Sequence, residues 1–205
     1  MTTIDPNSTA LLLIGYQQDY FDPNGLLYSV VEESHRVSGT LDHTLSLIDR
    51  FKESSMTMVN TPIVFSEFYK ELENPIGVLK MIRDAEAFKV GTSGAETISQ
   101  IAAYGDRIFT VPGKRSFNAF HHTELESLLR ERGVSRILIA GCVTSLCVNA
   151  TALYAFEAGF DVTILADCTS SRTPVEQDFF CENVFPLFAE VTTSDSITTD
   201  VGATV

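Results

Sequence analysis

A cysteine at the start of a predicted helix is the residue best placed to do chemistry in this 205-residue chain. Cys147 ends the segment GCVTSLC (141–147), which follows an apolar run at 136–140 and opens a helical stretch at 144–158. The positive end of a helix dipole and its free N–H groups favour a thiolate and can hold an oxyanion. Cys147 is therefore a candidate nucleophile. The alternative is a buried cysteine that only packs, and this fits three others better: Cys142, Cys168 and Cys181.

A lysine follows the end of another predicted strand. Lys114 comes directly after Pro112-Gly113, which close the apolar stretch 107–111. If this stiff turn brings the ammonium close to the thiol, its charge stabilises a thiolate and any developing oxyanion. A lysine exposed to solvent is the alternative interpretation.

The elements that position these residues alternate between strands and helices. Short apolar runs at 10–14, 62–65, 107–111, 136–140, 161–166 and 188–191 predict strands. Helices are predicted at 37–51, 95–104, 123–132, 144–158 and 174–184, with a short one at 78–83 inside a long excursion, 66–93. The tail from Thr192 is polar and predicted to be loose.

This order predicts an α/β fold: an open, doubly wound, mostly parallel sheet of about six strands with helices on both faces. In such sheets ligands bind beyond the carboxyl ends of the strands. The segments that begin at Gly15, Pro112 and Gly141 should meet at that edge.

Composition and charge exclude several classes of function. The net charge of −13 gives an acidic surface that repels phosphate backbones and anionic lipids, so neither nucleic acid nor a membrane is expected as a partner. No apolar run reaches the ~18–20 residues that cross a bilayer, and residues 1–9 lack the pattern of a secretory signal. The four cysteines form no C-x-x-C pair, which favours reduced thiols in the cytoplasm and no metal site.

Three segments, in this order, resemble the isochorismatase-like cysteine hydrolases, a family that includes nicotinamidases and related amidases. LLLIGYQQDYF (11–21) is similar to the family's L-L-x-I-D-x-Q-x-D-F pattern, and KRSFNAF (114–120) to K-x-x-x-(S/N)-A-F. GCVTSLCVNAT (141–151) is similar to G-x-x-T-x-x-C-V-x-x-T. The resemblance extends over residues 10–171 and implies one domain of this type over residues 1–205.

The resemblance also implies roles for particular residues. Cys147 would attack a carbonyl carbon, and Lys114 would support the thiolate and the developing charge. The backbone N–H groups of Val143 and Cys147 would form the oxyanion hole, next to a cis peptide between Cys142 and Val143. Nicotinamidases carry an Asp-x-His after the second strand, but residues 65–70 contain no histidine. No metal and no other cofactor are therefore expected.

One departure from the family pattern affects the chemistry. Gly15 stands where the family has the aspartate that takes the thiol proton and returns it to the leaving group. General acid–base catalysis contributes typically about 10²–10⁴-fold, so we expect a weakened enzyme in which Gly15→Asp increases turnover. Asp19 is a doubtful substitute, because four residues of strand span ~13 Å. Glu67 is a speculative one, and we expect Tyr20, Glu67 and Phe120 to contact the substrate.

The favoured hypothesis is a metal-independent cysteine hydrolase that acts on a small amide or related carbonyl compound through a Cys147 thioester. The alternative is a pseudoenzyme that serves as a small-molecule-binding or assembly module, and Gly15 supports it. A third hypothesis is a thiol sensor in which Cys147 is oxidised. The resemblance implies a homo-oligomer.

Overall fold

Six parallel strands form the central sheet of the computed structural model, which describes residues 1–199. Their order is β4-β3-β2-β5-β6-β7. The bounds are β2 Thr9–Ile14, β3 Thr57–Thr61, β4 Phe109–Thr110, β5 Arg136–Cys142, β6 Asp161–Ser170 and β7 Glu190–Thr192. The predicted α/β class and parallel sheet are confirmed.

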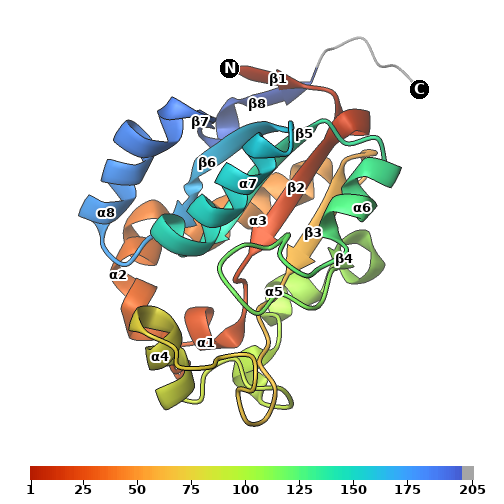
Figure 1. Ribbon diagram of the computed structural model, residues 1–205. Helices are drawn as coiled ribbons and strands as arrows, with labels where there is room; N and C mark the ends of the chain where they lie inside the picture. Colours follow the sequence, from red (N-terminus) through yellow and green to blue (C-terminus); the bar gives the residue numbers. More distant parts are fainter. Residues whose placement is uncertain (200–205) are drawn as a thin grey trace.

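Helices cover both faces of this sheet, with α7 in front of it and α3 behind it in Figure 1. Alternate residues of β2 point to opposite faces, and both sets are buried and apolar. This explains why the strand shows no polar alternation. The helices are α1 Gln18–Phe21, α2 Tyr28–Ser38, α3 Thr40–Phe51, α4 Gly77–Asp84, α5 Ser99–Ala102, α6 Leu125–Glu131, α7 Asn149–Glu157 and α8 Pro174–Phe179.

Besides the apolar clusters on the two faces of the sheet, a third apolar cluster covers the carboxyl ends of the strands. It combines residues from the segment after β2, from α2, from the segment after β3 and from the excursion 66–93 that contains α4. They are Tyr20, Val31, Phe65, Tyr69, Ile82 and Phe88. Cys142 and Val143, at the end of β5, belong to the same cluster. The excursion therefore covers the edge where the predicted site residues meet (Figure 1).

The close approach of β2 and β5 depends on a glycine at the end of β5. A Cβ on Gly141 would lie 1.9 Å from the carbonyl oxygen of Ile14, and the φ of Gly141 is +120°. Since no other residue fits this contact, Gly141 fixes the place where the chain leaves β5 toward Cys147.

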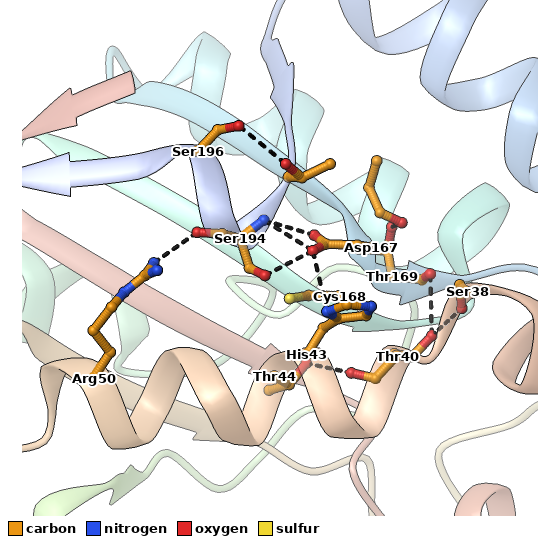
Figure 2. A network of polar contacts seen from close by, with 12 residues as sticks. Ser38, Thr40, His43, Thr44, Arg50, Asp167, Cys168, Thr169, Ser194 and Ser196 are labelled. Atoms are coloured by element: carbon orange, nitrogen blue, oxygen red, sulfur yellow. Dashed lines mark hydrogen bonds and ion pairs between the residues drawn. The ribbon is translucent and has the colours of Figure 1, made fainter. Parts of the chain in front are cut away.

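A polar network ties β6 to α3 and to the C-terminal segment (Figure 2). The Asp167 carboxylate accepts hydrogen bonds from the backbone N–H of Ser194 at 2.8 and 3.0 Å and from its hydroxyl at 2.6 Å. His43 of α3 lies 3.6 Å from the same carboxylate, and Arg50 donates to the Ser194 carbonyl at 2.6 Å. These contacts hold the segment that leads into the last strand.

That last strand corrects the prediction of a loose tail from Thr192. β8, Ile197–Thr199, pairs in parallel with β1, Thr2–Ile4, in a separate two-stranded sheet. The remainder of the predicted tail, 200–205, lies outside the described residues.

Two further predictions about element boundaries were wrong. The helix expected at 37–51 is two helices, because Gly39 adopts φ +63° and ends α2 before α3 begins. The strand expected at 62–65 is β3, Thr57–Thr61. The polar residues of β3 break the apolar run by which a buried strand is predicted. Asn60 and Thr61 are nevertheless buried, and their side chains donate to Thr97 and to the Leu13 carbonyl.

Within residues 1–199, no helix combines the length and the apolar character needed to span a bilayer.

Candidate active site

Cys147 lies in a helical turn that directly follows β5. The peptide between Cys142 and Val143 is cis, as the resemblance implies, and a π-helical turn, Thr144–Val148, then continues into α7. The Cys147 residue is only 6% exposed, so its thiol is largely covered. The two residues predicted for the oxyanion hole, Val143 and Cys147, thus belong to the start of the same helix.

Lys114 reaches Cys147 from the other half of the sheet. Its backbone continues β4 beside the extension of β3, where its carbonyl accepts the N–H of Val64 at 3.2 Å. Its Nζ lies 3.5 Å from the sulfur of Cys147, and the residue is 1% exposed. At this distance an ammonium stabilises the negative charge of a thiolate in surroundings that screen it weakly.

The Lys114 ammonium has few possible partners besides Cys147. Within residues 1–199 its only side-chain or backbone hydrogen-bond contact is the Cys147 sulfur, and no carboxylate oxygen lies within 4.0 Å. A buried cation normally needs an anion nearby. The arrangement therefore pairs one buried ammonium with one buried thiol.

Gly15, where the resemblance implies an aspartate, has no room for a side chain. Gly15 has φ +74°, and a Cβ on it would lie 2.7 Å from the Cys142 carbonyl oxygen and 3.2 Å from the Cys142 sulfur. The Cys142 thiol donates to the Gly15 carbonyl at 3.6 Å. Burial, and then the negative charge of Cys147, raise the pKa of Cys142 well above its ordinary value, so it is a neutral thiol.

Tyr20 lies near both thiols. The residue is 4% exposed, and its ring packs against Phe88 with centroids 5.0 Å apart. Burial raises the pKa of Tyr20 well above its ordinary value, and a negative charge on Cys147 adds to this effect. A phenol in these surroundings stays protonated and neutral.

The other predicted residues, Asp19, Glu67 and Phe120, differ in their surroundings, and Phe120 shares an apolar cluster with Cys147. Asp19 is buried, but its carboxylate accepts the backbone N–H of Phe88 at 2.6 Å and that of Leu26 at 3.2 Å. It thereby joins two loops. Glu67 is exposed and makes no hydrogen bond or ion pair with any described residue. Phe120 is buried in the core, where its ring stacks on Tyr154 with centroids 4.9 Å apart.

Two features of the site had no clear signal in the sequence. Cys142 looks like any buried cysteine in the sequence, and its place beside Gly15 depends on the pairing of β2 with β5. Glu71 accepts hydrogen bonds from the backbone and hydroxyl of Ser66 and forms an ion pair with Arg115. This ion pair ties the excursion to the residue that follows Lys114.

Metal ligands do not gather in the part of the chain that the structure describes. Among residues 1–199 there is no group of three or more His, Cys, Asp or Glu side chains with the geometry to hold a metal ion. The chemistry available at the site is that of a thiol, an ammonium and backbone N–H groups at a helix start.

Comparisons with known proteins identify relatives of this chain. The chain is 33% identical over 84 residues to the uncharacterised isochorismatase family protein YecD of Escherichia coli O157:H7, a match that covers 41% of this chain and 45% of that protein. It is 25% identical over 190 residues to the ureidoacrylate amidohydrolase RutB of Caulobacter vibrioides, which covers 83% of this chain and 80% of RutB.

Solved structures show the same fold. A cysteine hydrolase from Pseudomonas syringae pv. phaseolicola superimposes with a TM-score of 0.81 at 19% identity, covering 95% of this chain and 92% of that one. The model of the isochorismatase domain matches residues 9–196. Since this match takes in nearly all of the sequence, the chain belongs to the isochorismatase family of hydrolases.

Proposed function

We propose that the chain is a metal-independent cysteine hydrolase that cleaves the C–N bond of a small amide, or a related carbonyl compound, through a Cys147 thioester. The observation that carries this proposal is the 3.5 Å contact between the Lys114 Nζ and the Cys147 sulfur in a buried site. A thiolate attacks carbonyl carbon well, and a neighbouring ammonium keeps it ionised.

The rest of the site supports an acyl-transfer reaction. The helical turn Thr144–Val148 contains Cys147 and continues into α7, so the residue belongs to the first turn of a helix, where free backbone N–H groups and the positive end of the dipole lie. Groups of this kind stabilise the oxyanion that forms when sulfur adds to a carbonyl. RutB, with which the chain shares 25% identity, is named as an amidohydrolase, which is consistent with a C–N bond as the target.

The test is release of ammonia or amine from a panel of small primary and secondary amides. We expect turnover by the wild type and a loss of about 10³-fold or more in Cys147→Ala. Cys181→Ala, a partly buried cysteine outside the site, should retain full activity. Turnover that survives in Cys147→Ala would rule out this function.

A second candidate is a pseudoenzyme that binds a small molecule or takes part in an assembly. It is favoured by Gly15, which offers no carboxylate beside the thiol. In that case small amides would bind to the wild type without any turnover across the panel. A cytoplasmic location, a homo-oligomeric assembly, one domain over residues 1–205 and the absence of nucleic-acid and membrane partners belong to the proposal as well.

A further inference from the structure

The Lys114 ammonium is buried beside a thiol and has no carboxylate partner. The residue is 1% exposed, and among residues 1–199 the only hydrogen-bond partner of its Nζ is the Cys147 sulfur. As long as the sulfur is a thiolate, the two charges compensate each other. Once the sulfur becomes part of a thioester, the ammonium would be an uncompensated buried charge, which is strongly unfavourable. Loss of its proton at that moment removes the charge.

The other titratable groups considered for this role, among the residues that the structure describes, are not free to accept and release a proton. Cys142 and Tyr20 are held protonated, because burial raises the pKa of each well above its ordinary value. The Asp19 carboxylate is engaged with two backbone N–H groups, and Gly15 has no side chain. The lysine is the group that is both in contact with the sulfur and able to exchange a proton.

We propose that Lys114 carries the proton through the reaction, as the general acid when the thioester forms and as the general base when it is hydrolysed. Cys147 and Lys114 then form a two-residue catalytic unit that needs no carboxylate at residue 15. This inference rests on the proposed function, since it concerns the same thioester.

The first half-reaction balances within the pair. The Cys147 thiolate adds to the amide carbon, and the carbonyl oxygen takes the electron pair. The Lys114 ammonium gives a proton to the leaving nitrogen, the C–N bond breaks, and ammonia or an amine departs. The site then holds a neutral thioester and a neutral Lys114 amine, so no unpaired charge remains buried.

The second half-reaction restores the starting state. The Lys114 amine takes a proton from water while the water oxygen adds to the thioester carbon. The C–S bond breaks, the sulfur leaves as a thiolate beside the re-formed ammonium, and the product departs as a carboxylic acid. One water is consumed, and the pair regains its original charges.

Lys114→Arg distinguishes the electrostatic role of the lysine from its role in proton transfer. A guanidinium stays charged and does not deprotonate. The probe is p-nitrophenyl acetate, whose leaving group departs as an anion without needing a proton. We expect the variant to release a burst of p-nitrophenolate equivalent to its Cys147 content and then to stall. Its steady-state rate should fall at least about 10²-fold below that of the wild type. Lys52→Arg, at an exposed lysine, should behave like the wild type.

Steady turnover of the ester by a folded Lys114→Arg near the wild-type rate would overturn the proposal and leave the hydrolase function intact. A wild type that neither turns over the ester nor takes up an acyl group on Cys147 would instead remove the nucleophile, and with it both proposals. The two failures are therefore distinguishable.

If Lys114→Arg does not fold or is not acylated, Lys114→Ala acylated by the same ester provides the test. Trimethylamine can accept a proton, whereas tetramethylammonium supplies only charge. We expect trimethylamine to accelerate release of acetate at least about 10-fold over tetramethylammonium. Equal effects of the two, or no acceleration by trimethylamine, would overturn the proposal.

Discussion

The carbonyl oxygen and the sulfur of Cys142 border the space that a side chain on Gly15 would need. A Cβ at residue 15 would meet the Cys142 carbonyl oxygen at 2.7 Å and the Cys142 sulfur at 3.2 Å, and the φ of Gly15 is +74°. Both the backbone conformation and the space at this position therefore favour glycine. The missing carboxylate is thus accompanied by a local structure that has no room for one.

The first prediction is that Gly15→Ala destabilises the protein more than a glycine change that strains φ alone. Gly77 also has positive φ, +54°, but nothing lies within 4 Å of its added Cβ. We expect Gly77→Ala to lower the free energy of unfolding by about 1 kcal/mol and Gly15→Ala by about 2 kcal/mol or more. Urea denaturation of both variants measures the difference, and equal losses would show that the contact with Cys142 is unimportant.

The same contact changes what we expect of Gly15→Asp. From the sequence alone this substitution should increase turnover, but its Cβ would displace the carbonyl of Cys142 at the end of β5. We therefore predict lower stability and no gain in turnover on the amide panel. A turnover number above that of the wild type would contradict the account of this position.

Cys147 should be the fastest of the four cysteines to react with iodoacetamide. It is the thiol with an ammonium 3.5 Å away. Burial raises the pKa of Cys181 to about 11 and those of Cys142 and Cys168 further. We expect labelling of Cys147 to exceed that of Cys181 by about 10-fold or more near neutral pH, because the rate follows the thiolate fraction. Peptide mapping after short labelling measures the order, and faster labelling of Cys181 would contradict it.

Asp19 should be a structural residue and not the missing base. In Asp19→Asn one backbone N–H, of Phe88 or Leu26, would face an amide NH₂ in place of a carboxylate oxygen. We predict a loss of about 1–3 kcal/mol in the free energy of unfolding and an unchanged rate of Cys147 alkylation. Asp106→Asn, at an exposed aspartate, is the control and should change neither. A large loss of thiol reactivity in a folded Asp19→Asn would place Asp19 in the chemistry.

His35 should make stability fall in mildly acidic solution. Burial lowers the pKa of His35 to about 4, while its ordinary value is 6.5. Between these values the unfolded chain binds a proton that the folded chain does not, so stability decreases as pH falls through this window. The contribution is on the order of 3 kcal/mol.

His35→Gln keeps a partner for the Ser170 hydroxyl, which lies 2.6 Å from Nδ1, and removes the titrating group. Unfolding curves at several pH values should give a flatter profile between pH 6.5 and 4 for His35→Gln than for the wild type. His121→Gln, at an exposed histidine, should leave the profile unchanged. Parallel profiles for the wild type and His35→Gln would refute the assignment.

The meeting of Lys114 with Cys147 could be predicted from the sequence for a physical reason. Each follows the end of a predicted strand, and the carboxyl ends of parallel strands share one edge of the sheet. The same argument predicted that Gly15 lies at that edge. Such reasoning uses only strand periodicity and chain order.

What the sequence did not reveal depends on contacts between distant segments. The role of Cys142 beside Gly15 follows from the register of β2 against β5, and the Glu71–Arg115 ion pair from the path of the excursion. β3 was missed because buried Asn60 and Thr61 find partners only in the folded chain. Hydrogen-bond partners far apart in sequence leave no local periodic signal.

The most direct test of a Cys147 nucleophile is the mass of the protein after acid quench of its reaction with a hindered p-nitrophenyl ester, whose acyl group is removed slowly. Peptide mapping should then find one acyl group, as a thioester, on the peptide that contains Cys147, and none in Cys147→Ala. Ester turnover with no acyl group on Cys147, or with the group on another residue, would contradict the account.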